Sequence, residues 1–404
     1  MISVIIINYN SSIKMLDECI QSYINQKEAA IDLIVYDNNS KNYEELRAYE
    51  SELKGGYPGI TIQFEYSSKN LGFAKAVNNS VKMSLSEYVF ISNFDIQVRD
   101  DTLKNAMAVM DKFPDCAGVA SKVYFMHDRN LLDNVGTSID SNGSAFNRGV
   151  GLYDIGQYDI CERVFGVCFG ACLLRRDLFN EDKVGLLDES YFMYYEDVDW
   201  CYRANLQGYK FYSAPGSVVY HYHSLSVKNL KYGFKFRLIE RNLFFMVVKN
   251  FERKHMMRII VRRALSHGKN FMFGRFRTEI LKIYLDILFS IPRLIKQRYF
   301  MQKRRVIDDF QIFFLSYYEI PFFLPMEYAP ILNIDALMFI YKRLYLVTGN
   351  SKYHNILINL ELLNTSNLKF KKEFMDEKLS SLFRDEPGEV MKYIDNFKKG
   401  KGIF

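Results

Sequence analysis

The sequence predicts an α/β fold, in which a mainly parallel sheet flanked by helices is followed by a mostly helical C-terminal region. Two observations support this prediction. Over the first 112 residues of the 404-residue chain, short apolar runs alternate four times with segments of helical spacing. Such alternation with short connections is typical of a parallel sheet that helices cover on both faces. After about residue 228 the spacing is helical to the end of the chain.

Each element of the first half has its own signal. Residues 3–7 form a continuous apolar run, which is typical of a strand buried on both faces. In the helix that follows, Ile13, Leu16 and Ile20 fall on one face. By the same criteria we expect strands at 31–36, 61–66 and 88–92 and helices at 12–26, 42–53, 73–85 and 101–112.

The second half is less regular at first and then becomes helical. Small residues within 164–175 indicate a close approach of the backbone to a ligand or another strand. A short helix at 196–207, ended by Gly208, precedes a strand that turns at Pro215. Further amphipathic stretches lie near 233–250, 255–265, 277–290, 293–310 and 334–347, interrupted by a Pro-punctuated aromatic segment at 310–330. We therefore expect three regions, at 1–227, 228–309 and 310–404.

The composition and motifs exclude several classes of protein. The first ten residues lack the basic region and cleavage site of a signal peptide. No stretch reaches the ~18 uncharged apolar residues expected of a membrane span. The six cysteines are scattered without a CxxC, as expected for reduced cytosolic thiols. The sequence has no GxGxxG and no GxxxxGK[ST], which argues against a dinucleotide-binding fold and a P-loop ATPase.

Polar side chains follow all four predicted strands. In an open parallel sheet the ligand binds outside the carboxyl ends of the strands. Any one of these loops could simply be a turn, but four of them on one edge favour a nucleotide site. The four segments are Asn8-Tyr9-Asn10, Asp37-Asn38-Asn39-Ser40, Asn70-Leu71-Gly72-Phe73 and Ser92-Asn93-Phe94-Asp95.

Three carboxylates, those of Glu196, Asp197 and Asp199, lie within four positions directly after the aromatic run 191–195. Charges among aromatic side chains are costly and usually persist because a metal, a cation or a reacting proton needs them. The alternative is an acidic helix N-terminus favoured by the helix dipole, which accounts for one or two of the three. Asp199 and Arg203 are spaced i, i+4 and could pair as a structural clamp.

Taken together, these motifs resemble family 2 glycosyltransferases of the GT-A fold. The similarity covers about residues 1–250 and is greatest to the bacterial branch of rhamnosyltransferases and galactofuranosyltransferases that build surface polysaccharides. It implies an inverting transfer of a sugar from a nucleotide-activated donor, dTDP-rhamnose or a UDP-sugar, to a saccharide or lipid-linked acceptor. The segments that carry it are 3–10, 35–40, 70–73, 93–95, 195–200 and Pro215 to His221.

The resemblance also implies a donor site. Asp37 would bind the base, and Asn8, Tyr9 and Asn10 would line the base and ribose. The remaining expected nucleotide-sugar-binding residues are Asn39, Asn70, Phe73, Asn78 and Asn93.

A divalent metal, Mg²⁺ or Mn²⁺, is expected to bridge the diphosphate of the donor and neutralise its developing charge. By the resemblance Asp95 and His221 would bind this metal. His223 is an alternative ligand, because on a strand it would share the face of His221. The family shows Asn-Pro-Asp or Asp-x-Asp where this chain has Asn93-Phe94-Asp95, so one carboxylate is missing.

The catalytic residues implied by the resemblance lie in the acidic cluster. Single-displacement inversion needs one general base to deprotonate the acceptor hydroxyl. The family match places this base at Asp197, and an aromatic pocket raises the proton affinity of a carboxylate. We expect Glu196 to support Asp197, and Asp199 to pair with Arg203.

The charge is distributed unevenly. Residues 228–305 contain 21 Lys and Arg but only 4 Asp and Glu, whereas the whole chain has a net charge of +6. Docking on the anionic cytoplasmic leaflet is one interpretation, and a solvated helical face is another. Nucleic acid is not expected, because no recognised nucleic-acid motif accompanies the basic residues. We expect a cytoplasmic protein in peripheral contact with the inner face of the cell membrane, and the sequence leaves oligomerisation open.

Two other functions are found on alternating sheets of this kind. The missing carboxylate at position 93 is the main support for a catalytically weak nucleotide-sugar-binding or scaffold protein of the same fold, and the presence of Asp95, Asp197 and His221 together argues against it. A nucleotidyltransferase would need a Gly-rich, basic loop after the first strand, which the residues from Asn8 to Ser12 do not provide.

Overall fold

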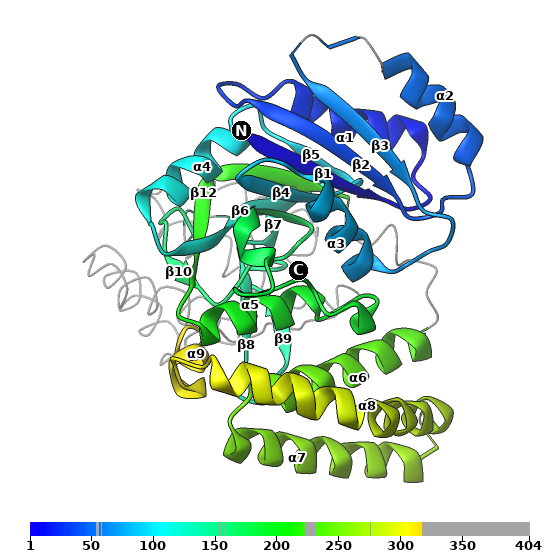
Figure 1. Cartoon of the computed structure of the whole chain (residues 1–404), viewed down its shortest axis with the longest axis vertical. Coiled ribbons are helices and arrows are strands. Elements are labelled where there is room, and N and C mark those ends of the chain that lie inside the picture. Colours follow the sequence, from blue (N-terminus) through cyan, green and yellow to red (C-terminus); the bar gives the residue numbers. More distant parts are fainter. Residues whose placement is uncertain are drawn as a thin grey trace, which may run out of the picture.

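The computed structural model (Figure 1) describes residues 1–53, 56–57, 59–152, 154, 156, 158–222, 232–274 and 276–316. His223, the greater part of the aromatic segment 310–330 and the helix expected at 334–347 lie outside these residues. Within the described part, a sheet with its covering helices occupies one end of the molecule. Three long helices, α6 (Tyr232–Asn250), α7 (Arg253–Met272) and α8 (Arg277–Lys303), occupy the other end (Figure 1).

The predicted alternation of strands and helices is confirmed. Ser12 begins the first helix by accepting a hydrogen bond from the Met15 backbone N–H, as its place before the apolar face predicts. The elements are β1 (Ile2–Asn8), α1 (Ile13–Ile24), β2 (Ile31–Asp37), α2 (Tyr43–Leu53), β3 (Thr61–Tyr66), α3 (Phe73–Met83), β4 (Tyr88–Asn93), β5 (Ile96–Val98) and α4 (Thr102–Lys112).

Strand β1 lies inside the sheet, between β2 and β4, and pairs in parallel with both. Strand β3 adds in parallel to β2. Beyond β4 come β11 (Ala171–Arg175), which is antiparallel to both of its neighbours, then β6 (Cys116–Phe125) and the parallel β12 (Lys210–His221). The order is β10-β12-β6-β11-β4-β1-β2-β3, in which β10 is Arg163–Val164. Strand β5 pairs with β12, and β7 (Asp128–Asn134) pairs with β6. The sheet is therefore mostly parallel, as predicted.

The irregular middle of the chain supplies short elements. They are β7 (Asp128–Asn134), β8 (Thr137–Ile139), β9 (Ala145–Asn147), β10 (Arg163–Val164), η1 (Arg176–Phe179) and η2 (Glu189–Tyr191). The expected turn at Pro215 is wrong, because β12 continues through the proline to His221. The pairing of β12 with β6 shifts register between Ala214 and Val218, and this irregularity accommodates a residue that has no N–H to donate.

Two apolar cores cover the two faces of the sheet. Alternate residues of β1 divide between them, with Val4 and Ile6 in one and Ile5 and Ile7 in the other. The first core includes side chains of α1, α2 and α4. The second includes side chains of α3, of α5 (Glu196–Leu206), where Trp200 is fully buried, of helices α6 to α8 and of α9 (Asp309–Phe314). The C-terminal helices therefore pack into the same core as the sheet.

The separate helices expected at 277–290 and 293–310 are wrong, because α8 is one continuous helix with Pro292 inside it. Pro292 lies on the exposed side of α8, where water can hydrogen-bond the carbonyl that the proline leaves without a donor. The short α9 (Asp309–Phe314) follows, with Asp308 as its capping residue. Among the described residues no helix is both long and apolar enough to span a membrane.

Candidate functional site

The carboxyl ends of β1, β2 and β4 lie at one edge of the sheet. Asn8 is opposite Asp37 in the parallel pairing of β1 with β2, and Ile7 is opposite Asn93 in the pairing of β1 with β4. Three of the predicted donor-binding segments therefore meet at this edge. We call it the donor edge.

Asp37 is held rigidly at the donor edge. Its Oδ1 accepts a 2.8 Å hydrogen bond from Asn8 Nδ2, and its Oδ2 accepts one of 2.9 Å from the Ser40 backbone N–H. Asn8 and Asp37 are both buried, whereas Asn10 and Asn39 are exposed in the left-handed backbone region, at φ of 55° and 69°. Buried partners fix the carboxylate. Of the two exposed amides, that of Asn10 accepts a 2.9 Å hydrogen bond at its Oδ1 from the Lys41 backbone N–H.

A second pair of amides joins the next loop to this edge. Asn38 Nδ2 donates to Asn70 Oδ1 over 3.1 Å, and Asn38 Oδ1 accepts from the Leu71 backbone N–H over 2.8 Å. Phe73 follows as the first residue of α3, and its backbone N–H donates to the Phe192 carbonyl over 2.6 Å. The loop that begins α3 therefore contacts both the donor edge and the aromatic run. Tyr9, Asn70 and Phe73 are all partly exposed.

Asn78 lies deeper than the other predicted donor-binding residues. Its Nδ2 donates to the Leu187 carbonyl and its Oδ1 accepts from the Leu187 N–H, each over 2.9 Å. The side chain is fully buried in α3 and joins this helix to the segment before the acidic cluster. These contacts form a structural link, and a direct contact of Asn78 with the donor stays a prediction.

Asp95 and His221, the predicted metal ligands, are neighbours. His221 Nε2 lies 3.3 Å from Asp95 Oδ1, and its Nδ1 lies 2.6 Å from Asp133 Oδ2. Burial lowers the pKa of His221, but the carboxylates of Asp133 and Asp95 outweigh it and raise this pKa to about 10. The buried Asp95 Oδ1 has no hydrogen bond of good geometry to any described residue. Without a metal, protonated His221 pairs with this oxygen. A divalent cation fits here in place of the Nε2 proton, because a ligating imidazole must be neutral.

Asp133 is the site residue that the sequence reasoning missed. It lies on β7, follows two leucines and is itself buried. The one signal in the sequence was a carboxylate inside an apolar strand, 88 residues from the histidine that it contacts. A second group of possible metal ligands, Glu252, His255 and Asp309, also exists among the described residues. Arg305 Nη1 lies 3.0 Å from Asp309 in that group, so a cation already neutralises it.

Glu196 and Asp197 begin α5. Glu196 is buried, and its Oε2 has no hydrogen-bond partner among the described residues. Burial and the neighbouring charge of Asp197 raise the pKa of Glu196 well above its usual value. Burial also raises the pKa of Asp197, although backbone N–H groups, including that of Val198 at 2.8 Å, oppose the shift. Asp197 is the only partly exposed carboxylate of the three in the cluster.

The segment Cys168–Gly170 connects Asp197 to the donor edge. Asn93 N–H donates to the Gly170 carbonyl over 2.9 Å, and a Cβ on Gly170 would meet Asn93 Nδ2 at 3.1 Å. Burial raises the pKa of Cys168, and the charges of Asp197 and Asp133 raise it further. The charges of Asp197 and Asp133 are therefore both felt at Cys168, and Gly170, two residues further along the same segment, contacts Asn93.

The ion pair predicted between Asp199 and Arg203 is confirmed, with Arg203 Nε 3.0 Å from Asp199 Oδ2. Asp199 is 0 % exposed and accepts further bonds from Tyr191 Oη and Asn250 Nδ2, at 3.1 and 2.8 Å. Lys249 of α6 completes this group, 3.0 Å from Asp199. Asp199 and Arg203 are thus enclosed in the interior, and their contacts are those of a structural clamp.

Lys249 extends the clamp to a second carboxylate. Its Nζ lies 2.9 Å from Asp188, which also forms a 2.9 Å ion pair with Arg293 of α8. Buried ions need such multiple partners, because each has lost its hydration. The network therefore fixes α6 and α8 against the helix that begins with the catalytic candidates.

The aromatic run before Glu196 has an unusual backbone. Phe192, Tyr194 and Tyr195 have φ of 65°, 67° and 69°, in the left-handed region that side chains disfavour. Asn242 of α6 holds this run, since its Nδ2 lies 3.0, 2.9 and 2.7 Å from the carbonyls of Tyr191, Met193 and Tyr194. Strained backbone of this kind occurs where the surrounding structure imposes it, often at functional sites.

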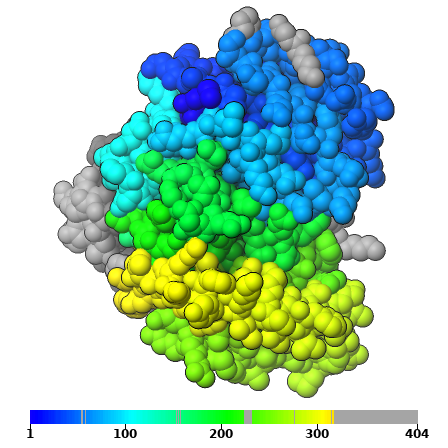
Figure 2. All heavy atoms as spheres, in the orientation of Figure 1, coloured from blue at the N-terminus to red at the C-terminus, as the bar shows by residue number. Residues whose placement is uncertain are grey.

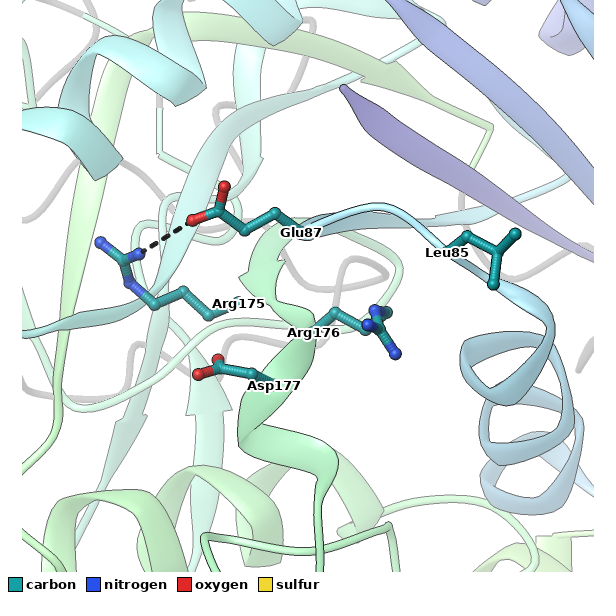
Figure 3. Close-up of a pocket in the computed structure, with 5 residues that line it drawn as sticks. All are labelled: Leu85, Glu87, Arg175, Arg176 and Asp177. Atoms are coloured by element: carbon teal, nitrogen blue, oxygen red, sulfur yellow. Dashed lines mark ion pairs between the residues drawn. The ribbon is translucent and has the colours of Figure 1, made fainter.

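The structure also has a pocket of about 310 Å³ away from these residues. Leu85, Glu87, Arg175, Arg176 and Asp177 line it, and Figure 3 shows Glu87 paired with Arg175. It lies where β4 begins and β11 ends, and is thus at the edge of the sheet opposite to the donor edge.

Comparison with known proteins identifies the first half of the chain. Residues 3–182 match the model of glycosyl transferase family 2. The low-salt glycan biosynthesis hexosyltransferase Agl10 of Haloferax volcanii is 25 % identical over 50 % of this chain and 61 % of its own length. The amylovoran biosynthesis glycosyltransferase AmsB of Erwinia amylovora is 26 % identical over 52 % of this chain and 65 % of its own length. The matches thus span less than two thirds of these relatives.

A solved structure shows the same fold. The crystal structure of GalNAc-T7 with UDP, GalNAc and Mn²⁺ superposes with a TM-score of 0.53 at 14 % identity, covering 72 % of this chain and 57 % of that one. The family match and the sheet, with its donor edge, agree with the fold predicted from the sequence. Residues 3–182 are a family 2 glycosyltransferase domain, and the fold is of the GT-A type.

Proposed function

We propose that the protein is an inverting glycosyltransferase. It moves a sugar from a nucleotide-diphosphate donor, dTDP-rhamnose or a UDP-sugar, to a growing bacterial surface polysaccharide or a lipid-linked oligosaccharide. The names of the two relatives, which concern glycan and amylovoran biosynthesis, support this class of product. The observation that carries the proposal is the position of Asp197, a partly exposed carboxylate beside the segment that contacts Asn93 at the donor edge.

The donor edge binds the nucleotide in this proposal. The carboxylate of Asp37, fixed by Asn8 and Ser40, accepts a hydrogen bond from the base. Asn10 and Asn39 are exposed at the same strand ends, and in this proposal their amide N–H groups donate to the ribose and phosphates. A preorganised acceptor beside adjustable donors gives selectivity for the base with tolerance for the rest of the donor.

Asp197 is the general base. Its raised pKa increases the proton affinity of the carboxylate, which favours removal of a proton from the acceptor hydroxyl. Glu196 supports it, because two adjacent carboxylates in a buried site resist simultaneous ionisation. The strained aromatic run and the clamp at Asp199 hold this pair in position.

Mg²⁺ or Mn²⁺ is the proposed cofactor, held by Asp95 and His221. The metal would neutralise charge that develops on the diphosphate leaving group. Asp133 orients His221 by binding its Nδ1, which leaves Nε2 directed toward Asp95. A carboxylate that fixes the ring of a ligating histidine in this way strengthens the ligand.

A donor screen with purified protein tests this function. Release of nucleoside diphosphate is measured for each donor with Mn²⁺, for the wild type, for Asp197→Asn and for the exposed control Asp182→Asn. We expect Asp197→Asn to lose a factor of about 10²–10⁴ in transfer rate while keeping nucleotide affinity, and Asp182→Asn to keep both. Transfer by Asp197→Asn at the wild-type rate would refute the base assignment.

The second candidate is a catalytically weak nucleotide-sugar-binding or scaffold protein of the same fold. One observation favours it: Asn93-Phe94-Asp95 supplies one carboxylate, and Phe94 is buried in the core of the sheet. Nucleotide binding without hydrolysis or transfer of any donor in the screen would support this alternative.

A lipid-linked acceptor places the reaction at a membrane. We propose that the protein acts in the cytoplasm, on the inner face of the cell membrane, in peripheral contact with anionic lipid. The same purified protein, sized in solution, will show whether an oligomer forms.

A further inference from the structure

Helix α8 exposes an apolar stripe. The spacing of Leu281, Leu285, Leu288, Ile295 and Tyr299 places them on one side of the helix, and all five are exposed. Phe289, beside them, is 80 % exposed. A helix of a water-soluble protein normally turns such a stripe toward the core, so these side chains indicate contact with something else.

Helix α7 has a stripe of the same kind. Met257, Val261, Leu265 and Met272 are all exposed, at spacings that repeat along one side of the helix. Figure 1 shows α7 and α8 at the end of the molecule opposite to α2 and β3, and α8 crosses the lower face as a yellow band in Figure 2. We call the exposed side chains of these two helices the α7–α8 surface.

The exposed charges of the α7–α8 surface are all positive. Within the two helices the exposed charged residues are Arg253, Lys254, Arg258, Arg262, Lys269, Arg277, Lys282, Lys296 and Lys303.

The two acidic residues of these helices are only partly exposed and already have partners. Glu279 pairs with Lys282 at 3.0 Å, and Asp286 pairs with Arg237 at 2.7 Å. The exposed charges of α7 and α8 are therefore all positive, and they lie on the same helices as the exposed apolar side chains.

We propose that the α7–α8 surface docks on an anionic lipid bilayer. Cations beside Leu, Ile and Phe are the composition of helices that lie in a membrane interface, where apolar groups enter the acyl boundary and Lys and Arg meet lipid phosphates. Charge complementarity favours this occupant over a second copy of the chain, since two surfaces of the same sign repel each other. The inference deepens the proposed function by assigning the surface that faces the membrane, and vesicle binding tests it without any donor or acceptor.

Flotation with vesicles tests the proposal on the full chain. Vesicles of phosphatidylcholine alone are compared with vesicles that contain about one third phosphatidylglycerol, at low and high salt. We expect binding to the anionic vesicles only, weakened by salt because surface charges are screened. Equal binding to both kinds of vesicle, or binding to neither, would overturn the proposal.

Two variants identify the surface. Lys296→Gln with Lys303→Gln removes two cations and should weaken partitioning roughly 30-fold, since each contributes a factor of about five near the membrane. Phe289→Ser should weaken it roughly tenfold by removing one apolar side chain from the interface. The matched controls are Lys14→Gln with Lys112→Gln, and Leu85→Ser. These residues are exposed and lie outside α7 and α8, in α1, in α4 and between α3 and β4, and Leu85 is 88 % exposed.

The outcomes separate this proposal from its alternatives. Loss of binding in the surface variants but not in the controls supports it, and equal loss in both sets refutes the assignment of the surface. A change of sedimentation from dimer to monomer in Phe289→Ser, without vesicle binding by the wild type, would show a second copy as the occupant and overturn the proposal. Release of nucleoside diphosphate in lipid-free buffer, measured on the same samples, reports on the transferase function independently.

Discussion

Asn242 controls the strained turn that precedes the catalytic candidates, and its replacement is a sharp test of the structure. Its side-chain amide contacts the carbonyls of Tyr191, Met193 and Tyr194 from inside α6, and it is 0 % exposed. Asn242→Ala removes all three contacts at once. The Tyr191 carbonyl keeps its hydrogen bonds from the Met193 N–H and from Arg241, but the partly buried carbonyls of Met193 and Tyr194 lose this donor. The left-handed backbone of the run is then free to relax.

The magnitude follows from these contacts. The loss of the donor costs about 1–3 kcal/mol for each of the Met193 and Tyr194 carbonyls. Relaxation of the three residues of positive φ recovers part of the roughly 1–2 kcal/mol stored in each. We expect the free energy of unfolding to fall by about 2–4 kcal/mol. The turn should also shift Glu196 and Asp197, and a displacement of about 1 Å at a reacting group can cost a factor of about 10² in rate.

Asn205→Ala is the matched control. Asn205 is also fully buried and donates to two carbonyls, those of Phe165 and Cys201, at 2.7 and 2.8 Å. Urea unfolding and sugar-transfer rates are compared for both variants at a temperature where each is folded. We expect similar losses of stability but a loss of transfer only in Asn242→Ala. Equal transfer rates in the two variants would refute the idea that Asn242 holds the turn for catalysis.

Three further predictions concern the buried charges. Asp133→Asn should weaken Mn²⁺ affinity about 10–100-fold through the loss of His221 orientation, as measured by calorimetry; an unchanged affinity would contradict this role. Lys249→Met should lower the free energy of unfolding by about 3–5 kcal/mol, because Asp188 then loses one of its buried cations, and a urea midpoint within error of the wild type would contradict the network. Burial alone would raise the pKa of Asp188, but Lys249 and Arg293 outweigh it and hold that pKa well below its usual value. Above the unfolded pKa of about 3.9, the ionised Asp188 carboxylate contributes its full stabilisation to the folded state, and this stabilisation is lost as the pH falls below that value. The urea midpoint of Asp188→Asn should therefore fall less steeply below pH 4 than that of the wild type.

The sequence predicts those parts of the fold that depend on neighbouring residues. The apolar run of β1 and the cap at Ser12 are local signals, and the structure confirms both elements. The meeting of Asn8 with Asp37 follows from a general rule of parallel sheets, and the pairing of Asp199 with Arg203 follows from one turn of helix.

The residues that the sequence did not reveal act through long-range contacts. Asp133 meets His221 across 88 residues, and Asn242 meets Tyr194 across 48. Neither pair has a periodic spacing, because packing of separate elements creates the contact. The wrong predictions at Pro292 and Pro215 came from a local signal and not from a missed long-range contact. Proline is a strong local signal, but an exposed helix side and a shifted strand register each accommodate it.

The buried ion network also has a consequence for protein engineering. The family match ends at residue 182, whereas Asp188, Asp199 and Lys249 all come after it. A chimera joined near residue 182 would take its donor edge from a relative and keep the clamp of this chain. The donor edge of one protein could then be combined with the catalytic helix of another. A junction at residue 228 would instead separate Lys249 from both carboxylates that it neutralises. A junction at residue 228 thus divides the clamp, whereas one near residue 182 leaves the clamp whole but separates His221 from Asp95 and Asp133.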